Sequence, residues 1–156
     1  MHVIYVGDSR NIRKRLKQHQ GGNIEASALR KHIAISKGFN IKTTRRKSGS
    51  YRRRLDSPDP KQGERELSHY IGSGTWSLAL CETYDEAHDL QWFLIEHLRP
   101  TLNIDKQKWD ATKRSRYEVL QLEMSRPLPL EKTPCPDGPG VYVLYHELLP
   151  REHRNS

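Results

Sequence analysis

The chain has 156 residues and a net charge of +8, with 34% hydrophobic and 29% charged residues, a composition typical of one small globular domain. It contains no run of 18 apolar residues and no signal-peptide layout at its N-terminus, so neither a membrane protein nor a secreted one is expected. Its two cysteines, Cys81 and Cys135, lack partners at metal-ligand spacing, which predicts reduced thiols in an intracellular protein.

Hydrophobic periodicity and turn residues predict the elements in chain order. They are a strand at 2–6, helices at 11–19 and 25–36, a basic loop at 42–61, a helix at 64–70, a strand at 75–81, helices at 85–98 and 106–124, a proline-rich linker at 125–139 and a strand at 140–146. The pattern indicates a single α+β domain over 1–156, with a small, mainly antiparallel sheet of about three strands flanked by helices.

The charge is distributed unevenly along the chain. Residues 1–54 contain 15 of the 27 Lys and Arg residues and only two acids, Asp8 and Glu25, while the remainder is net acidic. Such an asymmetry concentrates positive potential on one part of the surface, which is typical of a protein that binds a polyphosphate such as nucleic acid.

The stretch 42–61 is too polar and too basic to pack in a core, and Pro58 and Pro60 interrupt any helix. We therefore expect a mobile loop that contacts nucleic acid through phosphates, with a salt-sensitive affinity independent of sequence. Its expected contact residues are Arg45, Arg46, Lys47, Tyr51, Arg52, Arg53 and Arg54. Tyr51 either stacks on a base or lies in solvent, and the sequence favours neither alternative.

The N-terminal strand and the helix after it carry a phenol, a guanidinium and an imidazole. Tyr5 lies near the end of the strand, and Arg15 and His19 are four residues apart, hence on one face of the helix. An Arg stabilises charge on a phosphorane, and a phenol or imidazole accepts a proton from a nucleophile. Taken singly, each residue is more typical of a core or of a solvated surface.

The helix at 85–98 is amphipathic. Its buried face is expected to consist of Ala87, Leu90, Gln91, Leu94 and Leu98. Gln91 is the one polar residue of that face and needs a hydrogen-bond partner there, whereas Glu96 falls on the solvent side. The segment closes at Asn103, twelve residues after Gln91.

Together these features resemble the GIY-YIG nuclease superfamily. The residues that carry the likeness are Tyr5-Val6-Gly7, Arg15, His19, the run from Leu90 through Pro100 to Asn103, and Gly140-Val141-Tyr142. The resemblance covers residues 2–36, 64–104 and 138–146. Tyr70-Ile71-Gly72 also spells the motif, but it ends a helix and no Arg-bearing helix follows, so we discount it.

The two motif strands occur here in reverse order, since Gly140-Val141-Tyr142 lies far after Tyr5-Val6-Gly7. In the family they are adjacent in the sheet and joined by a short connection. Termini placed at such a connection lie at an exposed tip, where circular permutation is best tolerated. We therefore expect a circularly permuted fold, with strand exchange between two molecules through residues 140–146 as the rival.

The resemblance implies a role for each matching residue. Tyr5 and Tyr142 would flank the scissile phosphate, one of them as general base or activator of water. Arg15 would stabilise the phosphorane, His19 would orient or deprotonate a tyrosine, and Asn103 would hold the site by hydrogen bonding. Hydrolysis of DNA would require Mg²⁺ or Mn²⁺, with no metal expected to be tightly bound in this chain.

The family's metal-binding Glu falls on Gln91, whose neutral amide is a poor ligand for a hard cation. Either the natural protein has Gln and binds without cutting, or Gln was introduced to silence an active site. Because Glu→Gln is the usual isosteric way to silence such a site, the sequence favours a silenced variant of an active nuclease.

The first hypothesis is thus a metal-dependent endonuclease that acts on DNA, with double-stranded DNA as partner and a nucleoid-associated, cytoplasmic location. The second is a non-catalytic module that binds nucleic acid and keeps the nuclease fold. A weaker third, an accessory protein of RNA or the ribosome, rests only on size and charge. The chain acts as a monomer, as a strand-exchanged dimer or as two cooperating copies, and the sequence does not choose among them.

Overall fold

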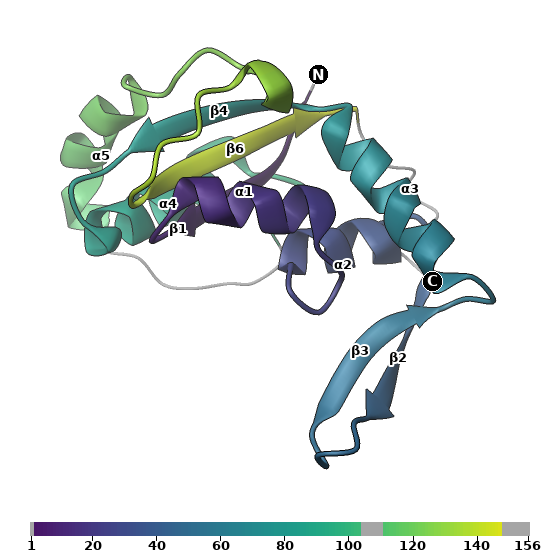
Figure 1. Ribbon diagram of the computed structural model, residues 1–156. Helices are drawn as coiled ribbons and strands as arrows, with labels where there is room; N and C mark the ends of the chain where they lie inside the picture. Colours follow the sequence, from purple (N-terminus) through teal and green to yellow (C-terminus); the bar gives the residue numbers. More distant parts are fainter. Residues whose placement is uncertain (1, 104–110, 148–156) are drawn as a thin grey trace. The chain divides into compact units, whose positions relative to one another are not determined.

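A computed structural model describes residues 2–103 and 111–147. The described chain forms two compact units, one from 2–16 with 73–103 and 111–147, the other from 17–72 (Figure 1). The boundary falls within helix α1 (Ile12–Gly21).

The first unit is built on a four-stranded antiparallel sheet. Its strands are β1 (His2–Ser9), β4 (Thr75–Leu80), β5 (Leu128–Pro129) and β6 (Gly140–His146), in the order β1-β6-β4-β5. The expected strand at 2–6 continues through Gly7 to Ser9, because the ladder with β6 extends to the pair of Ser9 and Gly140. The predicted α+β class and antiparallel sheet are confirmed, with one more strand than expected.

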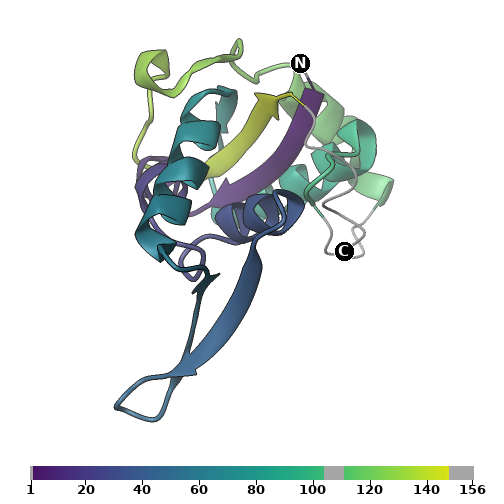
Figure 2. The same ribbon diagram turned by 90° about the vertical axis from the view of Figure 1, so that its right-hand side faces the viewer.

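Strands β1 and β6 lie side by side within one chain (Figure 2). Gly7 is the register partner of Tyr142, and a bulge separates Val3 from Tyr5. A side chain at position 7 would overlap the phenol ring of Tyr142, so glycine is required for the ring to lie over β1. The pairing supports the expected adjacency of the two motif strands.

Helix α4 (Tyr84–Leu98) packs on this sheet and begins with two favourable features. The Thr83 side chain accepts a hydrogen bond from the Glu86 backbone N–H, and acidic residues occupy the first turn. Its buried side chains are Ala87, Leu90, Phe93 and Leu94, joined in one core with strand residues such as Val6, Val141 and Val143. Leu98 is half-buried and packs against this core, as expected, whereas Gln91 is only half-buried.

The chain after α4 covers the outer edge of β1. Arg99 ends the helix in the left-handed region, with a φ of 49°, before Pro100. The backbone N–H of Leu102 then donates to the Ile4 carbonyl at 2.8 Å. Asn103 follows on the same edge, where its side chain pairs with the Val6 backbone. Backbone groups of Ile4 and Val6 on the open edge of β1 thereby gain hydrogen-bond partners.

The predicted helix at 106–124 lies partly outside the described residues, since 104–110 are not described. Its described part consists of the short 3₁₀ turn η1 (Ala111–Lys113) and α5 (Arg114–Gln121), which packs against α4. Part of the expected linker at 125–139 is regular, because it holds β5 and a second 3₁₀ turn, η2 (Leu130–Lys132). The strand pairs with β4 through Thr75 and Trp76, so this stretch is not merely an extended connection.

The second unit combines the end of α1 with α2 (Ala28–Ser36), α3 (Pro60–Gly72) and a hairpin of β2 (Asn40–Arg45) and β3 (Tyr51–Asp56). The expectation of a mobile loop at 42–61 is wrong: six register pairs, from Asn40–Asp56 to Arg45–Tyr51, form a regular ladder. Pro60 begins α3 rather than breaking it, since the first helical position needs no backbone N–H.

Two smaller corrections concern helix starts. Helix α2 begins at Ala28 because Ser27 caps it by accepting a hydrogen bond from the Arg30 backbone N–H, not at 25. The helix expected at 64–70 spans Pro60–Gly72, and Tyr70-Ile71-Gly72 does end it, as predicted. In the described residues both cysteines are free, and no helix has the length and apolar character needed to cross a membrane.

Candidate active site

Two tyrosines from adjacent strands meet on the sheet of the first unit. The rings of Tyr5 and Tyr142 are stacked, with centroids 6.3 Å apart and an interplanar angle of 29°. Tyr142 is fully buried, and Tyr5 is 9% exposed. The closeness that the sequence predicted for these two residues is therefore present within one chain.

Arg15, in the first half of α1, interacts with this pair. Burial raises the pKa of the Tyr142 phenol well above its ordinary value, and the neighbouring Tyr5 raises it further. The positive charge of Arg15 and its hydrogen bond to the phenol act in the opposite direction on that pKa. Arg15 is half-buried and thus combines contact with Tyr142 with access to solvent.

Asn103 fixes the strand that carries Tyr5. Its Oδ1 accepts from the Val6 backbone N–H at 2.8 Å, and its Nδ2 donates to the Val6 carbonyl at 2.7 Å. The side-chain amide thus imitates a neighbouring strand and satisfies both backbone groups of a fully buried residue. The hydrogen-bonding role expected for Asn103 corresponds to this geometry.

Position 91 lies on α4 in the same unit. Gln91 is half-buried and follows His88 by three residues, so the two side chains share a helix face. His88 contacts Asp8 near the end of β1. Glu96 is exposed and pairs with Arg114 at 3.2 Å, as expected for a residue on the solvent side.

A polar cluster that the sequence pattern did not predict surrounds Asp8. Its Oδ2 lies 2.7 Å from His88 Nδ1, and the Trp92 indole N–H donates to His88 Nε2 at 3.2 Å. Burial raises the pKa of the Tyr84 phenol, and the charge of Asp8 and a hydrogen bond with it raise that pKa further. The Arg10 guanidinium lies 4.2 Å from the centroid of the Tyr84 ring.

The cluster belongs to the surroundings of the tyrosine pair, because the negative charge of Asp8 also raises the pKa of Tyr142. Asp8 follows Gly7 directly in the sequence, and His88 precedes Gln91 by one turn of α4. These two positions could have indicated the cluster from the sequence: a carboxylate directly follows the Tyr5-Val6-Gly7 motif, and an imidazole lies on the helix predicted to hold the metal ligand.

The described residues fit a divalent metal poorly. The amide of Gln91 lacks the negative charge that Mg²⁺ prefers, and one carboxylate oxygen of Asp8 already pairs with the His88 ring. Within the described part of the chain, no three or more His, Cys, Asp or Glu side chains form a group that could hold a metal ion. The donor set therefore differs from that of a metal-binding nuclease at position 91.

His19 lies in the second unit. Its ring is fully buried, and Nδ1 is 2.6 Å from the Ser27 hydroxyl. Its backbone carbonyl accepts a hydrogen bond from the fully buried guanidinium of Arg30 at 2.9 Å. These contacts link the end of α1 to the start of α2, so they are structural contacts of the second unit.

The cationic residues expected to bind nucleic acid belong to the hairpin and its turn. Arg45 and Arg52–Arg54 lie in the strands, whereas Arg46 and Lys47 lie in the connecting turn. Glu25 pairs with Arg46 at 2.7 Å and with Arg54 at 3.3 Å. Tyr51 is 65% exposed, which leaves its ring accessible to a stacking partner.

Comparison with known proteins identifies the family of the chain. The family model described as the GIY-YIG catalytic domain matches residues 1–125. The matched region contains Tyr5, Arg15, Gln91 and Asn103 and ends before β6. No curated protein and no solved structure shows a significant match. Since the family model covers most of the chain, the protein belongs to the GIY-YIG catalytic domain family, a family of nucleases.

Proposed function

We propose that the protein is an endonuclease that hydrolyses phosphodiester bonds of DNA at a site formed by Tyr5, Arg15, Tyr142 and Asn103. The observation that carries the proposal is the stacked tyrosine pair with Arg15 hydrogen-bonded to Tyr142. A guanidinium beside two phenols is suited to a phosphate, because it supplies positive charge and the phenols supply hydrogen bonds to its oxygens.

The raised pKa of Tyr142 supports a hydrogen-bonding role for its phenol at neutral pH. Because burial raises its pKa well above the ordinary value, the phenol remains protonated and acts as a hydrogen-bond donor rather than as a ready base. Arg15 stabilises the charge that develops on the phosphate oxygens. Asn103 keeps β1, and with it Tyr5, in register. Tyr5 then is the phenol available to orient the attacking water.

Residue 91 limits the hydrolytic step. In the family a divalent metal, Mg²⁺ or Mn²⁺, stabilises charge on the reacting phosphate when bound. With Gln at this position the chain loses the charged ligand, so hydrolysis is weak while DNA binding is retained. This residue favours a silenced form of the nuclease and is also what supports the alternative, a module that only binds nucleic acid.

The order of the motif strands belongs to the same proposal. Strand β6 carries Gly140-Val141-Tyr142 and pairs with β1 on one side and β4 on the other. We propose that it occupies the place of the family's first strand, so that the fold is circularly permuted. The intrachain pairing of β1 and β6 supports this over exchange of the strand between molecules.

Double-stranded DNA is the proposed substrate, bound through the hairpin residues Arg45, Arg46, Lys47, Tyr51, Arg52, Arg53 and Arg54. The supporting observation is the exposure of most of these side chains on a regular hairpin. Phosphate contacts of this kind give affinity without base selectivity. With one site per chain, a monomer cuts a single strand and leaves a nick.

His19 contributes by supporting the helix that carries Arg15.

Nicking of supercoiled plasmid tests the proposal. The chain and its Gln91→Glu variant are incubated with plasmid in Mg²⁺ and, separately, in Mn²⁺, and nicked and linear products are measured. Gln121→Glu is the matched control, because it makes the same substitution on α5 of the same unit. We expect Gln91→Glu to nick the plasmid at a rate at least tenfold above the unchanged chain and above the control.

Two outcomes contradict the proposal. If neither form cuts yet both retard DNA on a gel, the non-catalytic binding module is correct. If the control cuts as fast as Gln91→Glu, added negative charge rather than the metal position accounts for the activity.

A further inference from the structure

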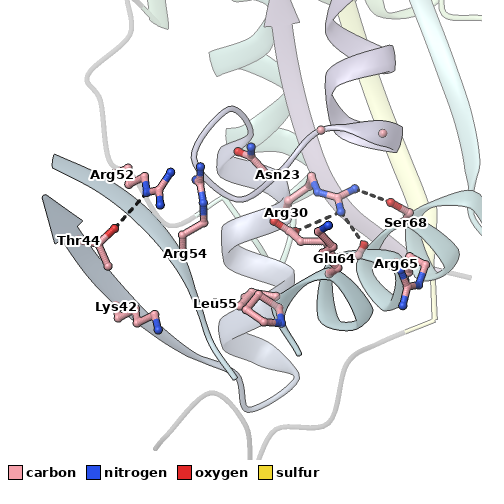
Figure 3. A pocket seen from close by; sticks show the side chains of 14 residues that line it. Asn23, Arg30, Lys42, Thr44, Arg52, Arg54, Leu55, Glu64, Arg65 and Ser68 are labelled. Atoms are coloured by element: carbon pink, nitrogen blue, oxygen red, sulfur yellow. Dashed lines mark hydrogen bonds and ion pairs between the residues drawn. The ribbon is translucent and has the colours of Figure 1, made fainter. Parts of the chain in front are cut away.

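The second unit contains a cavity of about 740 Å³ whose lining includes six Lys and Arg residues (Figure 3). It is bounded by the turn after α1, by the hairpin and by α3. The residues that line it include Arg30, Lys42, Arg52, Arg54, Lys61 and Arg65. All of its lining residues lie within 17–72, so the cavity is complete within this unit.

Arg30 forms a rigid part of the wall. The side chain is fully buried, and its Nη1 donates to the carbonyls of His19 and Gln20 and to the Ser68 hydroxyl. Its Nη2 donates to the backbone carbonyl and the carboxylate of Glu64, at 2.7 and 3.2 Å. These bonds connect α1, α2 and α3 and fix the shape of the wall before any ligand binds.

One donor of this buried guanidinium is left over. Arg30 Nε is buried and has no hydrogen-bond partner among the described residues. A buried N–H without an acceptor is costly, and the other hydrogen bonds of this guanidinium offset that cost. The hairpin residues and the α3 residues that line the cavity surround the same volume.

The positive charge of the cavity is only partly neutralised. Glu64, which also lines it, is engaged by Arg30, and Arg54 pairs with Glu25 at 3.3 Å. In the part of the chain that the structure describes, the Lys42 and Lys61 side chains have no hydrogen-bond or ion-pair partner. Lys42 and Arg54 are register partners in the hairpin, so two cations occur at one level of the wall.

The charge and the volume of the cavity together indicate the chemical class of its ligand. Arg and Lys in a concave site are suited to phosphate, and a volume of about 740 Å³ lies within the range of sites that hold nucleotide-sized groups. Pro60, which is half-buried, adds apolar surface for a sugar or a base.

We infer that this cavity binds a phosphate-bearing segment of the substrate strand, separately from the bond that is cleaved. The inference rests on the proposed function, because it gives a second anchoring point to the same DNA substrate. It also extends the nucleic-acid contact surface from the hairpin to α3, where Lys61 and Arg65 contribute.

The test measures the fluorescence anisotropy of a labelled short DNA duplex at several salt concentrations. The double variant Lys42→Glu, Lys61→Glu reverses the two unpaired cations, and Lys132→Glu makes the same change at an exposed site of the first unit. A second pair, Lys42→Gln with Lys61→Gln, removes the charge without adding a repulsive one. Circular dichroism checks that every variant is folded.

We expect the Glu pair to weaken binding by at least tenfold at low salt, and the Gln pair to weaken it less. The slope of log affinity against log salt should decrease by about one for each phosphate that the variant no longer binds. Lys132→Glu should change the affinity less than twofold. Equal affinities for the Glu pair and this control would overturn the inference.

A competition experiment distinguishes a cavity that binds a DNA strand from one that binds a free nucleotide. Unlabelled single-stranded DNA should displace the duplex from the unchanged chain but only weakly from the Glu pair. If a nucleoside triphosphate displaces it at the same concentration as the single strand, the cavity is a site for free nucleotides and the inference fails.

The nicking assay with Gln91→Glu is run in parallel with these variants. Retained nicking with unaltered duplex binding would refute only the cavity inference. Absence of nicking in every variant would refute the proposed function, while the anisotropy data would still decide whether the cavity holds DNA.

Discussion

Gly7 and Tyr142 illustrate how single residues determine the site. A Cβ at position 7 would overlap atoms of the Tyr142 ring, which is itself fully buried between strands. The glycine of the Tyr5-Val6-Gly7 motif is therefore needed for space, because the partner strand places a phenol directly over it.

We predict that Gly7→Ala destabilises the protein by about 1–3 kcal/mol, the usual cost of overpacking a filled core. It should also displace the Tyr142 ring and lower nicking by the Gln91→Glu form. Urea unfolding measures the first effect and the plasmid assay the second. Gly21→Ala is the control, because a Cβ there would meet nothing within 4 Å. Equal stability of both variants would show that the ring does not need the space.

Among the site residues, the sequence predicted the tyrosine pair, Arg15 and Asn103, because each stands at a recognisable motif position. It did not predict Asp8, His88 and Trp92, whose hydrogen bonds join residues 80 positions apart in the chain or one helix turn apart. Such pairs depend on how α4 packs on β1, and no local pattern encodes that.

Helices α4 and α5 are joined by a polar contact whose strength depends on pH. The Tyr117 hydroxyl donates to Asp89 Oδ2 at 2.8 Å, and the Tyr117 ring is almost fully buried. Burial first, and then the hydrogen bond and charge of Asp89, raise the pKa of Tyr117 from 10.0 to about 12. The folded state thus favours the neutral phenol.

Since the folded pKa of Tyr117 is raised, its contribution is complete below the unfolded value of 10.0 and is lost between there and about 12. A shift of this size corresponds to about 2–3 kcal/mol of unfolding free energy. We predict that the native chain loses this amount relative to Tyr117→Phe as the pH rises from 9 to 12. Urea unfolding across that pH range measures the difference, and parallel curves for the two proteins would contradict the prediction.

The hairpin shows why an element can be missed. Residues 42–61 lack the apolar alternation of a half-buried strand, and only Leu55 of β3 is buried. The ladder forms because the register pairs place β-branched Thr43 and Thr44 opposite arginines, and because α3 packs against β3. The composition of this segment correctly predicts that its side chains are exposed, but it wrongly predicts a loop. Backbone hydrogen bonding between the two strands does not depend on the charge of the side chains, so the composition cannot reveal it.

Positive charge and the tyrosine chemistry fall in different units of the protein. Residues 17–72 contain 13 Lys and Arg residues and five acids, a net charge of +8, whereas the remainder of the chain is neutral overall. The tyrosine site belongs to the first unit and the cationic cavity to the second. We therefore assign phosphate binding chiefly to one unit and bond cleavage to the other.

Tyr142 and Arg15 form the proposed nuclease site, and we propose that Gln91 lowers its activity. The most direct measurement is the single-turnover nicking rate of the Gln91→Glu form with and without Arg15→Ala, under conditions where both bind DNA equally by anisotropy. We predict that loss of Arg15 slows nicking by roughly 10²–10³-fold, as expected for removal of one donor to a developing negative charge. Nicking at an unchanged rate would show that the reaction occurs elsewhere and would contradict the assignment.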